Sequence, residues 1–106
     1  MMHIDDLLKL QSAIFGLCRD TIAERGEQYS TTADTLAAFK RASAIAQNTP
    51  TQVCLNLLAV KVSRLSQLII DIDKSKNIKT KKHILEDTVV DLINYLVLLY
   101  AIESEK

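Results

Sequence analysis

The chain has 106 residues, enough for one small domain and too few for two of typical size. Its 13 Lys and Arg residues balance 13 Asp and Glu residues, which argues against a general nucleic-acid binder because such a protein needs a basic face. Hydrophobic residues make up 48% and aromatic residues 5%, and glycine and proline are scarce. This composition predicts a few long helices around an aliphatic core.

No secretory signal or membrane span is expected. Residues 1–6 are acidic where a signal would be basic. The apolar run at residues 89–102 is shorter than the roughly 20 residues of a membrane span, and it carries Asp91, whose charge is costly in lipid. Cys18 and Cys54 lie in apolar helical patterns without the close spacing of a metal motif. We therefore expect two buried thiols in a reducing cytoplasm.

The first half of the chain predicts two helices. Apolar residues recur at helical spacing over residues 4–25, with Asp5 and Asp6 in the first turn, where the helix dipole favours acids. Gly26 is a natural stop just past the end. After a polar link, a shorter helix is expected over residues 32–47, with an apolar inner face.

The second half predicts two longer helices. Thr49 fits an N-cap and is followed by proline, which suits a first helical position, so a third helix is expected over residues 50–73. Five lysines within residues 74–82 predict a basic, solvated loop. A fourth helix is then expected over residues 80–103, with Thr80 as its cap.

These patterns indicate an all-α fold in which residues 1–106 form a single helical domain, an antiparallel four-helix bundle with short links. The fourth helix is apolar on nearly every side over residues 89–102. Such a helix needs to be buried, and a chain this small has little interior. We therefore expect a homo-oligomer, a dimer or a larger assembly, formed through the apolar third and fourth helices.

The acids of the fourth helix are the best candidates for chemistry. Asp87, Asp91 and Asn94 follow i, i+4, i+7 spacing and share one face, which runs into apolar residues. Two carboxylates one turn apart suit Mg²⁺, which prefers carboxylate oxygens together with substrate phosphates. On the third helix, Lys61 and Arg64 lie three residues apart and offer two cations at a matching distance.

The residues alone leave three arrangements open. Asp87 and Asp91 could hold a metal ion, or they could pair with Lys61 and Arg64 as a structural ion-pair network. In a mixed site the two acids would hold metal while the two cations hold phosphate. Asp91 needs one of these partners because a buried, unpaired carboxylate is costly. Lys61 could also lay its stem on the core and lift its ammonium into water.

The order of these motifs resembles the MazG-like all-α nucleotide pyrophosphatases, and more closely their small phage-encoded relatives, the nucleotide-modification-associated helical domains. The matching positions are Arg25 and Tyr29 after the first helix, Phe39 and Ala42 in the second, Lys61 and Arg64 in the third, and Asp87, Asp91 and Tyr95 in the fourth. The resemblance implies a helical oligomer that handles nucleotides. It implies nucleotide-binding roles for Arg25, Tyr29, Lys61, Arg64, Asn94 and Tyr95, and a Mg²⁺ site at Asp87 and Asp91.

The chain departs from the hydrolytic members of that family. Their third helix carries two glutamates three residues apart, and a further glutamate stands three residues before the aspartate of the fourth helix. Here those positions are Lys61, Arg64 and Thr88, so the acidic metal set is incomplete. The resemblance therefore implies binding of a nucleotide or cyclic nucleotide by a phage-type protein, and a cytoplasmic location is expected. Any hydrolysis would be Mg²⁺-dependent release of pyrophosphate.

Two alternatives to this function stay open. The first is a non-catalytic sponge that sequesters host nucleotide immune signals. The second is a ligand-free helical module for oligomerisation or regulation, in which the charged residues of the third and fourth helices pair with one another. Such buried pairs fix register more readily than they add stability.

Overall fold

The computed structural model describes residues 1–29, 34–74 and 78–106, and the side chains of residues 26–29 and 78–80 lie outside that description. The helices are α1 (Ile4–Tyr29), α2 (Ala37–Ala46), α3 (Pro50–Lys74) and α4 (Ile78–Ser104). The described residues contain no strand. The expected all-α class with four helices is therefore confirmed.

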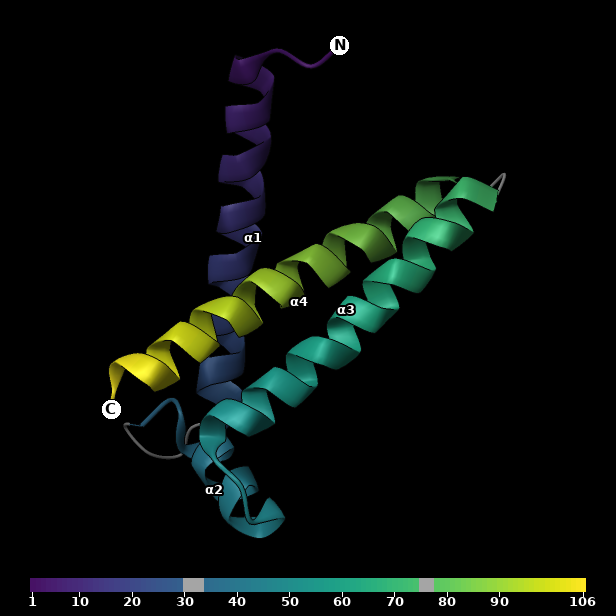
Figure 1. The fold of residues 1–106 in the computed structure, drawn as a ribbon. Helices are drawn as coiled ribbons and strands as arrows, with labels where there is room; N and C mark the ends of the chain where they lie inside the picture. The colour runs from purple at the N-terminus through teal and green to yellow at the C-terminus, as the bar shows by residue number, and fades with distance from the viewer. Residues whose placement is uncertain (30–33, 75–77) are drawn as a thin grey trace.

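Helices α3 and α4 form the frame of the molecule. They lie side by side and run in opposite directions, as Figure 1 shows. The short helix α2 packs against α3 near its start, and α1 crosses α4 (Figure 1). Only the second half of α1 rests on α4, because the first half extends away from the α3–α4 pair.

Several predicted helix ends are wrong. Helix α1 continues through Gly26 to Tyr29, because a single glycine costs a helix only about 1 kcal/mol and Arg25 is anchored on α4 just before it. Helix α4 begins at Ile78, so Thr80 is not its cap. The segment predicted as a basic loop is helical outside residues 75–77, which are not described. Lysine is a good helix former, which fits this extension.

Helix α2 begins at Ala37, five residues later than the sequence predicts. The cause is local, because the Asp34 carboxylate accepts a hydrogen bond of 3.0 Å from the backbone N–H of Leu36. An aspartate that binds the backbone two residues on favours a turn over a helix. Residues 32 and 33, which the sequence also assigns to this helix, lie outside the described residues.

The buried core lies where α2, the start of α3 and the end of α4 meet. Leu36, Cys54 and Ile102 are its buried members, and Cys54 is fully enclosed, with 0% of its surface exposed. Phe39 and Tyr95 pack against this cluster and are partly buried. The expectation of two buried free thiols is confirmed for Cys18 and Cys54.

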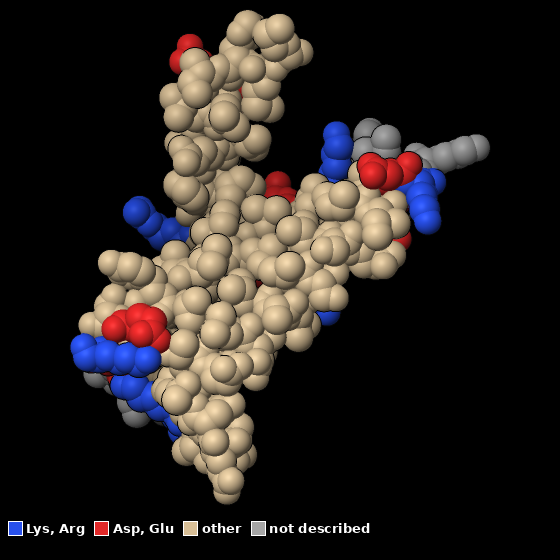
Figure 2. Space-filling model, viewed as in Figure 1, with Lys and Arg blue, Asp and Glu red and all other residues tan. Residues whose placement is uncertain are grey.

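A large apolar surface remains uncovered in the single chain. The chain exposes 7855 Å² and has a radius of gyration of 16.1 Å. A compact monomer of 11.9 kDa would expose about 6,000 Å², with a radius of about 13 Å. On the face shown in Figure 2, charged side chains gather toward the ends of the α3–α4 pair and leave much of its middle free of charge. Helix α3 is also long and apolar enough to cross a membrane by length and composition, although only 11% of its most apolar window is buried.

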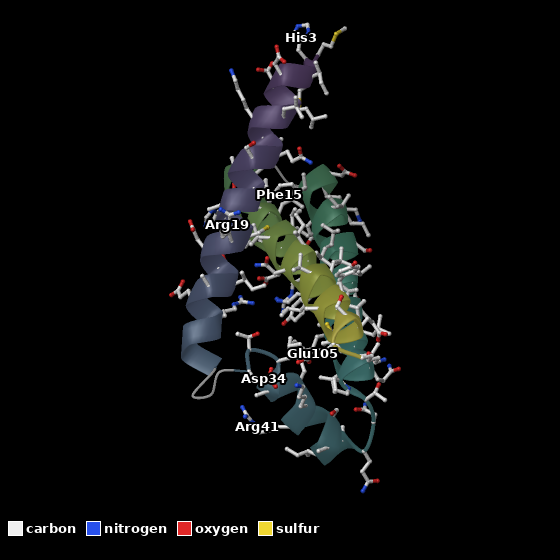
Figure 3. All side chains as sticks on the ribbon, turned by 90° about the vertical axis from the view of Figure 1, so that its left-hand side faces the viewer. His3, Phe15, Arg19, Asp34, Arg41 and Glu105 are labelled. Atoms are coloured by element: carbon white, nitrogen blue, oxygen red, sulfur yellow. The ribbon has the colours of Figure 1, made fainter. Side chains whose placement is uncertain are left out.

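An ion pair ties α2 to the end of α4. The Lys40 ammonium lies 2.6 Å from Asp34 Oδ2 and 3.2 Å from Glu105 Oε2, and Figure 3 shows the two acids where α2 and α4 meet. The hydrogen bond from Lys40 lowers the pKa of the Asp34 carboxyl, with help from the Leu36 N–H. The hydrogen bonds that Lys40 donates to Asp34, foremost, and to Glu105 raise the pKa of Lys40.

We expect Thr49→Ala to lower the free energy of unfolding by about 1 kcal/mol. The Thr49 hydroxyl accepts a hydrogen bond of 3.1 Å from the Gln52 N–H, so the predicted cap of α3 is confirmed and its loss leaves that donor unpaired. Urea unfolding at one protein concentration measures the effect, and Thr49→Ser, which keeps the hydroxyl, is the control. Equal destabilisation by both variants would contradict the cap.

The Asp34 pair predicts a pH dependence. Because the folded state lowers the Asp34 pKa, the pair stabilises the fold above the ordinary aspartate pKa. That contribution disappears as the pH falls through the lowered value. An NMR titration of the Asp34 carboxyl should show this low midpoint, and Lys40→Met should return it toward the ordinary value. Arg41→Met, which changes the neighbouring cation, should leave the Asp34 midpoint unchanged.

Candidate functional site

The candidate site is a cluster of three charged residues from three helices. Asp91 on α4 receives the Arg25 guanidinium of α1 on Oδ1 at 3.2 Å and the Lys61 ammonium of α3 on Oδ2 at 2.9 Å. The side chain of Asp91 is 15% exposed and that of Lys61 is 19% exposed, whereas Arg25 is 44% exposed. The Asp91 carboxylate therefore lies inside the junction of the three helices, and the Arg25 guanidinium lies at the solvent-exposed edge of that junction.

The cluster has more positive than negative charge. Both oxygens of the Asp91 carboxylate accept from a cation, and such charge-assisted bonds are about twice as strong as neutral ones. One positive charge remains uncompensated by Asp91, because Arg25 and Lys61 share a single carboxylate. The arrangement therefore suits an added anion better than an added metal cation.

A second set of bonds fixes α1 on α4 beside the cluster. The Asn94 amide donates to the Cys18 carbonyl oxygen at 3.1 Å, and Asn94 is only 6% exposed. The Cys18 thiol in turn donates to the Val90 carbonyl oxygen at 3.9 Å. Asn94 therefore holds the helix crossing, and its predicted contact with a nucleotide stays a prediction.

The two thiols contribute packing and not reactivity. Burial raises the pKa of Cys18 and of Cys54, so both are neutral at physiological pH and poor nucleophiles. The Cys54 thiol donates to the Tyr95 carbonyl oxygen at 3.5 Å. The ring of Tyr95 is partly buried against the core. Tyr29, the other predicted aromatic contact, has its side chain outside the described residues.

Among the residues that the structure describes, Asp87 and Arg64 form no ion pair with the Asp91 cluster. The Asp87 carboxylate is 68% exposed and lies 3.8 Å from the His83 ring on the same helix. With Glu86 these residues form an exposed group whose ligand atoms lie within 4.8 Å of one another. Arg64 is exposed and makes no ion pair with an acid that the structure describes. Of the cation–acid pairs that the sequence left open, the structure forms Lys61–Asp91.

The sequence did not link Arg25 with Asp91, although a signal for it exists. Arg25 follows Cys18 and Ile22 at i+7 and i+3, so it continues the apolar stripe by which α1 rests on α4. A cation at the end of such a stripe points toward the neighbouring helix. Only the crossing of α1 over α4 shows which acid it meets.

A surface hollow lies where the segment before α2 meets the end of α4. It is lined by Asp34, Thr35, Leu36, Ala101, Ser104 and Glu105. None of these residues is among the predicted site residues. The Asp91 cluster lies away from this hollow, at the junction of α1, α3 and α4, and Arg25 is its most exposed member.

Comparison with known proteins leaves the family resemblance as a hypothesis. No protein-family model, curated protein or solved structure matches this chain. Function therefore has to be argued from the geometry of the site.

The Asp91 cluster predicts a sharp difference between two aspartates one turn apart. Asp91→Asn should lower the free energy of unfolding by about 2 kcal/mol, because it weakens two charge-assisted bonds and leaves Lys61 without its anion. Asp87→Asn changes an exposed carboxylate and should stay within about 0.5 kcal/mol of the wild type. Parallel urea titrations test this, and equal effects would refute the structural role of Asp91.

Proposed function

We propose that this chain is a phage-type nucleotide-binding protein with a MazG-like helical fold, which holds a nucleotide without hydrolysing it. The single observation that carries the proposal is the excess of cations around Asp91. Arg25 and Lys61 bind the phosphates, and Arg64, one turn beyond Lys61 on α3, adds a third positive charge.

The exposure of the cations sets their roles. Arg25 has nearly half of its side chain in solvent, so its guanidinium turns toward a phosphate while Lys61 keeps Asp91 compensated. A guanidinium offers a planar fork that matches two phosphate oxygens. Tyr29 or Tyr95 stacks on the base, as the family resemblance implies, and Tyr95 is partly buried against the core.

The donor set of Asp91 fits Mg²⁺ poorly. Both carboxylate oxygens are already paired, and an incoming divalent cation would face Arg25 and Lys61 at the same place. The second predicted ligand, Asp87, is exposed beside His83. We therefore assign no step to Mg²⁺, and the Asp91 carboxylate serves to orient the two cations.

The assembly is part of the same proposal. The chain exposes about 1,900 Å² more than a compact monomer of its mass, which is more than a standard interface takes from each partner. We infer that copies of the chain complete an antiparallel four-helix bundle through the apolar faces of α3 and α4. The free thiols of Cys18 and Cys54 suit a reducing cytoplasm.

A second candidate is a ligand-free helical module for oligomerisation or regulation. The observation that favours it is the complete pairing of the Asp91 carboxylate within one chain. In that case Arg25 and Lys61 serve only to join α1 and α3 to α4. The two candidates differ in whether the cluster takes up an external anion.

A recovery experiment tests the proposal. The protein is incubated with nucleoside triphosphates, cyclic dinucleotides and Mg²⁺, separated and denatured, and small molecules in both fractions are identified by mass spectrometry. We expect an unaltered nucleotide to be released from the protein. Arg25→Gln should lower this recovery about tenfold, because it removes a charge-assisted contact to phosphate. Lys82→Gln removes an exposed cation elsewhere on α4 and should leave recovery unchanged.

Other products would overturn the proposal. Nucleoside monophosphate and pyrophosphate in solution would identify a pyrophosphatase. No nucleotide in the protein fraction would favour the ligand-free module. An unaltered cyclic dinucleotide that stays bound through prolonged washing would refine the proposal to a sponge for nucleotide signals.

A further inference from the structure

One face of α3 carries a seam of uncharged, mostly apolar side chains that the described residues of the chain leave exposed. The seam consists of Leu55, Ala59, Val62, Ser66 and Ile69, all of which are exposed. The exposed fraction is 41% for Leu55, 47% for Val62 and 44% for Ile69, which are the large residues of the seam. The spacing alternates between four and three residues, which is the pattern of a helix that packs along another helix.

The seam differs from the stripe that already has a partner. The neighbouring stripe on α3 faces α4, and its members Cys54 and Leu68 are buried while Lys61 pairs with Asp91. Helix α3 therefore exposes apolar side chains beyond the stripe that α4 covers, and the seam is one line of them. The seam itself contains no charged residue, so it offers nothing that would select a partner by charge.

The order of residues in the seam is symmetric about its centre. Large and small side chains alternate from Leu55 to Ile69, with Val62 in the middle. If a second α3 lay antiparallel across this face, Leu55 would meet Ile69 of the second copy. Ala59 would then lie near Ser66 of that copy, and two small residues allow helices to approach closely. A two-fold interface requires this kind of self-complementarity.

We propose that the seam is the two-fold interface of a homodimer, with α3 antiparallel to α3 of a second copy and Val62 at the axis. The surface excess supports this occupant, because about 800 Å² per partner suffices for a standard interface and the chain exposes about 1,900 Å² beyond a compact monomer. The interface deepens the homo-oligomer proposed above. Nucleotide recovery and cross-linking are independent measurements, so either idea can fail alone.

Cross-linking at the axis tests the interface in the full chain. Val62→Cys should form an intermolecular disulfide within minutes of mild oxidation, seen by non-reducing electrophoresis. Ser63→Cys, an exposed neighbour turned about 100° around the helix from Val62, should react at least tenfold more slowly. Wild-type chain is the control for Cys18 and Cys54, which are buried. Sedimentation should give twice the chain mass for the wild type.

Mixed cysteine variants test the direction of the helices. A mixture of Ala59→Cys and Ser66→Cys chains should cross-link between the two variants, whereas each variant alone should react slowly. Rapid self-linking of Ala59→Cys would indicate parallel helices and overturn the register. A monomeric wild type, or equal reaction of Val62→Cys and Ser63→Cys, would overturn the interface itself.

Discussion

The arrangement of α1, α3 and α4 depends on the compensation of one carboxylate. Asp91 is mostly removed from solvent in a stretch of α4, residues 89–102, where Asn94 is the only other strongly polar residue, so its charge has to be balanced by neighbouring helices. Lys61 from α3 supplies one cation and Arg25 from α1 supplies the other. Because each cation meets its own oxygen, the carboxylate fixes the registers of α3 and of α1 along α4 at the same point.

This constraint also explains why the site suits an anion. Both oxygens of the Asp91 carboxylate are already paired, so the carboxylate is a poor ligand for a metal ion. Arg25, the more exposed of the two cations, leaves positive charge at the solvent-exposed edge of the junction. Asn94 reinforces the crossing by binding the Cys18 carbonyl, so α1 is held near Arg25 by a neutral bond as well as by the ion pair. The helices can therefore stay joined if Arg25 turns to a phosphate.

The sequence predicted the parts of the fold that depend on local chemistry. The apolar periodicity gave four helices, Thr49 gave the start of α3, and burial of both cysteines followed from the stripes in which they lie. The prediction that α1 ends before Gly26 is wrong, because packing of α1 on α4 outweighs the stop signal of one glycine. The prediction that Thr80 caps α4 is also wrong, because the helix propensity of the lysine-rich segment lets α4 begin at Ile78. The Lys61–Asp91 pair was one of several open arrangements. The contribution of Arg25 depends on how α1 crosses α4, which no spacing in the sequence encodes.

The first half of α1 exposes further apolar surface besides the α3 seam. Ile4, Leu8 and Phe15 are each at least half exposed, and Phe15 lies on the part of α1 before the Cys18 contact (Figure 3). A helical segment of this length is marginal in water without tertiary contacts, since helices shorter than about 12–15 residues are barely stable alone. Its apolar stripe continues the one seated on α4 through Cys18. Arg25 stands at the other end of this stripe, so the cation proposed to bind phosphate lies on a helix that is anchored on α4 at one end and exposes apolar side chains at the other.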